Sequence, residues 1–139
     1  MFHRILAPLD FTQKNFRALE IARQIALQNK ASVVLLHVIE TVEHIPDEEL
    51  KGFYEKLEAT ARERMRLPAS MMLERDVCVD PEVVYGRRAE EIVRYATAND
   101  VDLIVMSSHK IGAEEAGHGW ATISYKVAVL AQCPVLLVK

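Results

Sequence analysis

The sequence predicts a single α/β domain with a mostly parallel sheet and helices on both of its faces. Short apolar runs rich in β-branched residues alternate along the chain with longer segments that carry one apolar stripe at helical spacing. This alternation is typical of βαβ units, in which crossover helices join parallel strands. The 139 residues, 50% of them hydrophobic, suffice for one core, and no repeat or Gly/Ser linker divides them. We therefore interpret residues 1–139 as one domain.

The first βαβ unit is predicted at the amino terminus. Residues 5–8 form a short apolar run, which predicts the first strand. A helix follows, and its apolar stripe consists of Ala18, Leu19, Ala22, Ile25 and Ala26. Residues 32–38 are then almost continuously apolar, as expected of a strand that is buried on both faces.

The second helix is predicted over residues 47–65. It begins with three acidic residues, which suit the positive amino-terminal end of a helix, and we expect Pro68 to end it. Residues 71–85 are the least regular part of the chain. Their valines suit a strand, but Asp80-Pro81 interrupts it, so we expect an edge strand here.

The remaining elements follow Gly86, which we expect to adopt a backbone conformation closed to other residues. They are a helix over 89–96, a strand over 101–106, a loop over 107–120, a helix over 123–131 and a final strand over 134–138. The final strand is apolar and lies at the end of the chain. A soluble monomer would have to protect such a strand at a sheet edge.

Composition excludes several classes of function. The net charge of −3 gives no basic surplus for nucleic acid or for an anionic membrane surface. No apolar run approaches the roughly 18 residues of a membrane span, and the amino terminus lacks a signal sequence, so we expect a cytoplasmic protein. The two cysteines, Cys78 and Cys133, have neither metal-site nor disulfide-scaffold spacing, and we expect both to be buried.

A ligand site is expected at the carboxyl ends of the strands. In an open parallel sheet the crevice forms where adjacent connections leave toward opposite faces. This geometry nominates Asp10, just past the first strand, and the loop after Met106, which begins Ser107-Ser108-His109-Lys110.

Each nominated residue also has a purely structural interpretation. Asp10 and Gln13 have capping-box spacing, so Asp10 either caps the first helix or contacts a ligand. Ser107 and Ser108 either bind a phosphate or complete local turn bonds. Thr122 either caps the last helix or binds an anion at its positive end. Val38 is a core residue by default, and His109 has no visible catalytic partner.

The ordered set of these segments resembles the universal stress protein family. The similarity covers essentially the whole chain and rests on residues 5–11, 35–39, 84–92, 101–106 and 133–138. The resemblance implies an open, Rossmann-like sheet of the adenine nucleotide alpha hydrolase type, with strand order 3-2-1-4-5. It also implies a homodimer joined through the last strand.

The loop after the fourth strand departs from the pattern G-x2-G-x9-G-[S/T] of family members that bind ATP. Ser107, Lys110 and Ala121 stand where the three glycines would fall, and Thr122 stands at the hydroxyl position. The interval from Lys110 to Ala121 is also longer than the pattern requires. Because those glycines let the backbone approach phosphates, we predict a vestigial or altered phosphate site.

The resemblance implies a set of ligand-binding residues. It likens Asp10 to the residue beside the nucleoside, Val38 to the backbone contact for the base, and Met106 to part of the pocket wall. The full set of candidates is Pro8, Asp10, Val38, Met106, Ser107, Lys110, Thr122 and Ile123. The implied ligand is ATP or AMP, with Mg²⁺ only if a triphosphate binds.

Two functions remain open at this point. The first is a non-catalytic regulatory or stress-response homodimer with a vestigial or altered nucleotide pocket, acting through an unidentified protein partner. The alternative is an adenine-nucleotide-binding switch. A phosphoacceptor signalling domain is disfavoured because the further acidic residues that it needs do not follow the strands. No catalytic residue and no metal site is predicted.

Overall fold

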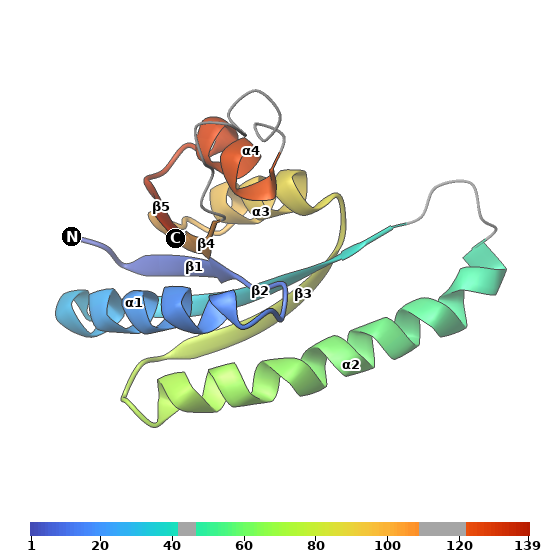
Figure 1. Ribbon diagram of the computed structural model, residues 1–139, viewed down its shortest axis with the longest axis horizontal. Coiled ribbons are helices and arrows are strands. Elements are labelled where there is room, and N and C mark those ends of the chain that lie inside the picture. The colour runs from blue at the N-terminus through green and yellow to red at the C-terminus, as the bar shows by residue number, and fades with distance from the viewer. Residues whose placement is uncertain (42–46, 109–121) are drawn as a thin grey trace.

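The computed structural model describes residues 1–41, 47–108 and 122–139. Within these residues strands and helices alternate, as Figure 1 shows. The elements are β1 (Arg4–Pro8), α1 (Lys14–Asn29), β2 (Ser32–Glu40), α2 (Asp47–Leu73), β3 (Val79–Gly86), α3 (Arg88–Ala98), β4 (Leu103–Ser107), α4 (Ile123–Leu130) and β5 (Val135–Val138).

The strands form one sheet in the order β3-β2-β1-β4-β5, and every neighbouring pair is parallel. Helices α1 and α2 cover one face, and α3 and α4 cover the other (Figure 1). The predicted α/β class, strand order and Rossmann-like architecture are confirmed. Strand β1 lies between β2 and β4. The connections that lead to these two neighbours leave toward opposite faces of the sheet, and folds of this kind form a crevice where they diverge, at the carboxyl end of β1.

The core consists of two layers, one on each face of the sheet. Successive residues of a strand point to opposite faces, so Ile5 of β1 packs in the layer under α1, whereas Leu6 packs in the layer under α3. Both side chains are fully buried. This double burial explains why the central strands appear as continuous apolar runs in the sequence.

Helix α2 does not end at Pro68, and the prediction that it would was wrong. The helix continues to Leu73 with Pro68 inside it. Proline removes one backbone hydrogen bond of the helix, but the turns beyond it are anchored in the core: Met72 is buried, and Ala69 packs against the core under α1. Tertiary packing therefore outweighs the local preference of Pro68.

Strand β3 is an edge strand, as predicted, but Asp80-Pro81 does not interrupt it. It pairs with β2 without a break from Val79 to Gly86. The Cys78 carbonyl accepts a bond from Val33 of β2, so alternate residues direct their backbone groups to β2 and Pro81 directs its nitrogen to the open side. The missing N–H of Pro81 therefore removes no bond of the sheet.

Gly86 ends β3 in the conformation that the sequence predicted. Its φ is +144°, and a Cβ there would lie 2.6 Å from Glu91 Cγ. The expected burial of the cysteines was wrong for Cys78, which is exposed just before β3, while Cys133 is half-buried. In the described parts of the chain, no helix has the length and apolar character to cross a membrane.

Candidate functional site

A cavity of about 310 Å³ lies at the carboxyl ends of β1, β2 and β4, beside the first turns of α3 and α4. Most of the residues that the sequence nominated line it: Pro8, Asp10, Val38, Met106, Ser107, Thr122 and Ile123. Lys110 lies outside the described residues. The cavity is lined in addition by Leu9, Lys14, Leu36, Arg88, Ile92, Ser108 and Ser124. Its volume is at the small end of the roughly 300–1,000 Å³ usual for ligand sites.

Asp10 shapes the turn between β1 and α1 but does not cap the helix. Its Oδ1 accepts hydrogen bonds from the Thr12 backbone N–H at 3.0 Å and from the Thr12 hydroxyl at 2.7 Å. Helix α1 begins later, at Lys14, and its N-cap residue Gln13 makes no side-chain cap. The predicted capping box is therefore wrong, and the Asp10 carboxylate closes a local turn instead.

The surroundings of Asp10 in this turn favour the ionised form of its carboxyl group. Burial by itself raises the pKa of the carboxyl, but the bonds from Thr12, the side chain of Asn15 and the charge of Arg88 together outweigh it. The pKa of Asp10 consequently lies below its ordinary value, so the carboxylate is ionised at neutral pH.

Asn15 joins the two sides of the cavity. This residue of α1 is only 4% exposed, and its Oδ1 accepts bonds from the backbone N–H groups of Asp10 and Phe11 at 3.0 and 2.9 Å. Its Nδ2 donates to Ser107 Oγ at 3.0 Å. One buried amide thus fixes the turn after β1 against the end of β4.

His37 supports the same turn from β2. Its Nδ1 lies 2.8 Å from the Leu9 carbonyl, and its ring lies 4.3 Å from the ring of Phe11. Phe11 has a φ of +64°, an unusual value for a residue with a side chain, and these contacts help to hold it there. Burial and the nearby Arg88 and Arg64 lower the pKa of His37, although the Leu9 bond opposes them.

Val38 offers backbone groups to the cavity. The pairing of β1 with β2 ends at Pro8 opposite Leu36, and the Leu9 N–H bonds to the Leu36 carbonyl at 2.8 Å. Alternate residues of a strand direct their backbone groups to the same side. Val38 stands two residues after Leu36, so its N–H and C=O also point to the β1 side of β2, beyond the residue at which the pairing with β1 ends. A donor and an acceptor therefore stand next to each other at the cavity wall, although the Val38 side chain belongs to the core.

Hydroxyl groups gather at the start of α4. Thr122 caps this helix, since its Oγ1 accepts from the Tyr125 backbone N–H at 3.2 Å, which confirms one of its two predicted roles. Ser124 Oγ lies 3.0 Å from Ser108 Oγ, and the Lys139 ammonium lies 3.4 Å from the same Ser108 oxygen. These groups can all donate hydrogen bonds to an anion.

The sequence of the whole chain, residues 1–139, matches the profile of the universal stress protein family. The chain belongs to this family. Among relatives of this universal stress protein is one from Thermus aquaticus, which is 33% identical over 144 aligned residues that cover 100% of both chains.

Solved structures agree with the fold of this universal stress protein. UspA from Lactobacillus plantarum has a TM-score of 0.84 at 23% identity, with 99% of this chain and 98% of that one covered. The universal stress protein from Archaeoglobus fulgidus in complex with dAMP has a TM-score of 0.73 at 18% identity, with coverages of 99% and 98%. At these identities the two likenesses concern the fold.

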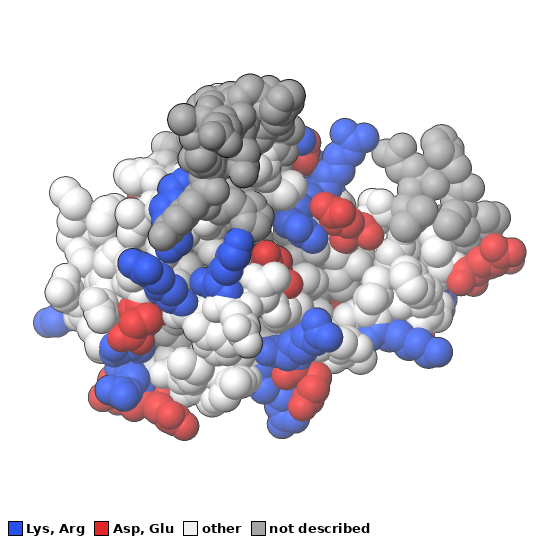
Figure 2. Space-filling view, viewed as in Figure 1, with Lys and Arg blue, Asp and Glu red and all other residues white. Residues whose placement is uncertain are grey.

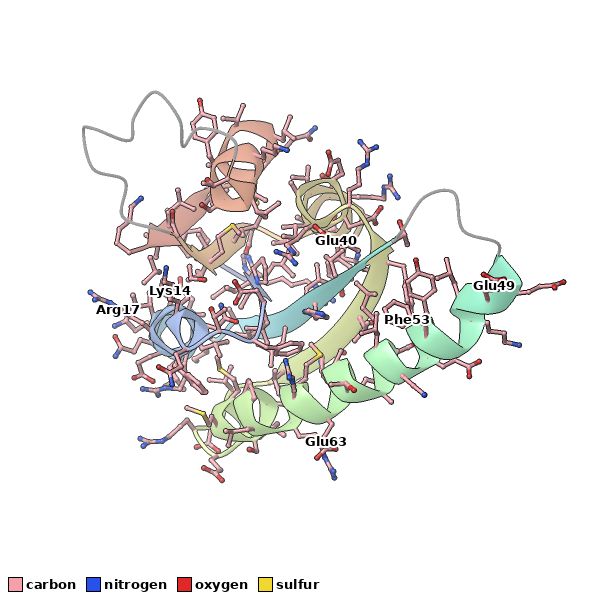
Figure 3. The ribbon with its side chains drawn as sticks, turned by 45° about the vertical axis from the view of Figure 1, so that its right-hand side comes forward. Lys14, Arg17, Glu40, Glu49, Phe53 and Glu63 are labelled. Atoms are coloured by element: carbon pink, nitrogen blue, oxygen red, sulfur yellow. The ribbon has the colours of Figure 1, made fainter. Side chains whose placement is uncertain are left out.

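Two cations of the cavity were missed by sequence reasoning. Lys14 opens α1 and Arg88 opens α3, and Arg88 Nε lies 3.9 Å from Glu40 Oε1 at the end of β2. Figure 3 shows Lys14 at the start of α1 and Glu40 at the end of β2. The available signal was position, because each cation opens the helix that follows a strand whose carboxyl end is on the cavity side. Elsewhere on the face shown in Figure 2, basic and acidic side chains are interspersed.

The described residues contain no group of three or more histidine, cysteine, aspartate or glutamate side chains that could hold a metal ion. The described lining of the cavity combines apolar walls, the backbone groups of a strand end, several hydroxyls, two cations and one carboxylate.

Proposed function

We propose that this universal stress protein is a non-catalytic regulatory protein that binds an adenine nucleotide in an altered pocket. The observation that carries the proposal is the open backbone of Val38 facing a cavity that also holds Lys14 and Arg88. One end of the cavity suits a heterocyclic base and another suits an anion. A nucleotide combines both groups.

The base is assigned to the Val38 side of the cavity. Adenine presents a ring nitrogen acceptor next to an amino donor, and these complement an adjacent backbone N–H and C=O. Pro8 and Met106 provide apolar surface for the ring. The universal stress protein from Archaeoglobus fulgidus that shares this fold was solved in complex with dAMP, an adenine nucleotide with one phosphate.

The phosphate is assigned to the other side, where Ser107 and Thr122 line the cavity with the two cations. Ser107 stands where ATP-binding relatives have glycine, and its Cβ blocks the close backbone approach that a triphosphate uses. We therefore propose AMP or ADP as better ligands than ATP.

The absence of catalysis is part of the proposal. Ser107 is bonded by the Asn15 amide, and His37 directs Nδ1 to a backbone carbonyl, so within the part of the chain that the structure describes neither stands in a serine–histidine pair. Nucleophilic catalysis needs a base within hydrogen-bond reach of the nucleophile.

The experiment is isothermal titration of the purified protein with adenosine, AMP, ADP and ATP, with and without Mg²⁺. We expect AMP or ADP to bind more tightly than ATP, and Asp10→Ala to weaken the binding. Mass spectrometry of the purified protein checks for copurifying nucleotide. No heat with any of the four compounds, together with no copurifying nucleotide, would leave the pocket vestigial and refute nucleotide binding.

We further propose a homodimer through β5. The strand lies at an edge of the sheet, and Leu136 is 38% exposed. On the adjoining helix α4, Val129 and Leu130 are 63% and 52% exposed. Leu136 lies on the face of the sheet that α1 covers, and α4 lies on the other face, so apolar side chains flank the open strand on both faces and pairing with a second copy would cover them.

A further inference from the structure

The direction of the hydrogen bond between Asn15 and Ser107 is fixed by the surrounding backbone. Two main-chain N–H groups, of Asp10 and Phe11, point at the same atom of the Asn15 amide. An N–H can only donate, so that atom must be the amide oxygen. The NH2 group is then the one that faces Ser107 at 3.0 Å, and the amide cannot be turned over without losing both backbone bonds.

This direction determines what Ser107 presents to the cavity. A serine hydroxyl has one proton to donate and two lone pairs that accept. The bond from Asn15 occupies a lone pair, so the hydroxyl proton is directed elsewhere. Ser107 lines the cavity, and among the described residues no other hydrogen-bond partner of its Oγ is found. The hydroxyl is therefore preset as a donor toward the cavity.

The charges around the cavity favour an acceptor that is negative. Among the described residues, the cavity is lined by Lys14, by Arg88, whose Nε lies 3.9 Å from Glu40 Oε1, and by one carboxylate, that of Asp10. That carboxylate is engaged with both donors of Thr12. A hydrogen bond from a neutral hydroxyl to an anionic oxygen is stronger than one to a neutral acceptor, particularly in a site that is partly shielded from water.

We infer that Asn15 is a positioning residue that holds Ser107 as a hydrogen-bond donor for a phosphoryl oxygen of the ligand, at the end of β4. The inference rests on the proposed function and makes it more specific: affinity depends on the phosphate, so a nucleotide is preferred to its nucleoside. The side chain of Ser107 thereby replaces the backbone approach that glycine allows at this position in ATP-binding relatives.

One substitution reverses the hydrogen bond without removing it. In Asn15→Asp, one carboxylate oxygen still accepts from Asp10 and Phe11, but the other can only accept from Ser107. The Ser107 proton then turns toward α1, and a lone pair faces the cavity. We expect Asn15→Asp and Ser107→Ala each to lower the affinity for AMP about 10- to 100-fold, the range for a hydrogen bond to a charged group. The affinity for adenosine should change little.

The double variant separates hydrogen-bond direction from added charge. Asn15→Asp also introduces a negative charge, which would repel a phosphate whether or not Ser107 is present. If Asn15 acts through Ser107, Asn15→Asp should cause a smaller loss in the Ser107→Ala background than in the wild type, because only the effect of the charge remains there. An equal loss in both backgrounds would assign the effect to charge alone and overturn the inference. Thermal unfolding of all three variants shows that they remain folded.

Other outcomes distinguish the inference from the proposal on which it rests. If the wild-type protein binds AMP and adenosine equally tightly, or if Ser107→Ala binds AMP as tightly as the wild type, nucleotide binding stands and the role of Asn15 and Ser107 is refuted. If the wild-type protein binds neither compound, the proposed function itself fails and the inference fails with it.

Discussion

The side-chain amide of Asn15 and the hydroxyl of Ser107 lie 3.0 Å apart, although 92 positions separate them in the sequence. The bond connects the first turn of α1 with the last residue of β4, so it spans the point at which the sheet connections diverge. The two strands that flank the cavity are thus tied together by one buried side chain.

Replacing Asn15 with leucine should destabilise the protein. The backbone N–H groups of Asp10 and Phe11 would lose their acceptor, and unsatisfied donors in partly buried positions cost about 1–3 kcal/mol each. We expect urea denaturation to show a loss of at least about 2 kcal/mol. Gln13→Leu is the control, because Gln13 is exposed and makes no cap. Equal stability of the two variants would contradict the role assigned to the Asn15 amide.

Gly86→Ala should also destabilise the protein, by about 1–3 kcal/mol, because φ at this position is positive and the new Cβ would meet Glu91. Gly52→Ala is the matched control. Nothing lies within 4 Å of a Cβ at Gly52, which is inside α2, so alanine there should raise stability by about 0.5–1 kcal/mol. The same denaturation assay measures both, and a gain of stability at both positions would show that the backbone of Gly86 tolerates a side chain.

Leu136→Lys should shift the protein from dimer to monomer. A lysine on β5 would bring like charges together across a two-fold pair of edge strands and would leave their apolar surface exposed. Light scattering coupled to size exclusion gives the mass directly. Leu27→Lys, at a similarly exposed position on α1, serves as the comparison and should keep the wild-type mass. If the dimer mass persists in Leu136→Lys, the interface lies elsewhere.

His37 should make stability depend on pH in the acidic range. Burial lowers its pKa in the folded state below the ordinary value of 6.5, so on acidification the unfolded chain binds the proton first. The contribution of the neutral His37 ring to the free energy of unfolding is fully present above about pH 6.5 and decreases as the pH falls toward the folded-state pKa. In His37→Phe, the decrease in unfolding free energy between pH 7 and pH 5 should be smaller than in the wild type, in buffers at about 25 °C. An identical decrease in the two proteins would show that other titratable groups cause the loss of stability.

The fold could be predicted because the central strands are buried on both faces and the helices on one. Ile5 and Leu6 illustrate the point: consecutive residues enter different core layers, so the run is apolar throughout. Local signals failed where tertiary contacts overrode them. Pro68 lies inside a helix whose last turns are held by Met72, and Pro81 lies in an unbroken strand because its nitrogen faces the open edge.

The candidate site was predicted less completely than the fold. Asp10 follows β1 and Ser107 ends β4, and the carboxyl ends of these strands meet, so topology alone brought both residues to one cavity. Asn15 was not recognised, because nothing in the sequence distinguishes a buried asparagine on the first turn of a helix from a solvated one. Arg88 was missed for a related reason: its place at the cavity depends on β3 lying beside β2, and that strand had the weakest pattern.

The two outer strands of the sheet differ in their capacity to accept a further strand. Along β3, Pro81 turns a nitrogen without hydrogen toward the open side, whereas β5 carries no proline between Val135 and Val138. Two copies joined through β5 would therefore present a proline-bearing strand at each outer end of the combined sheet. Further strand addition at those ends would be disfavoured, because Pro81 offers no N–H to an added strand.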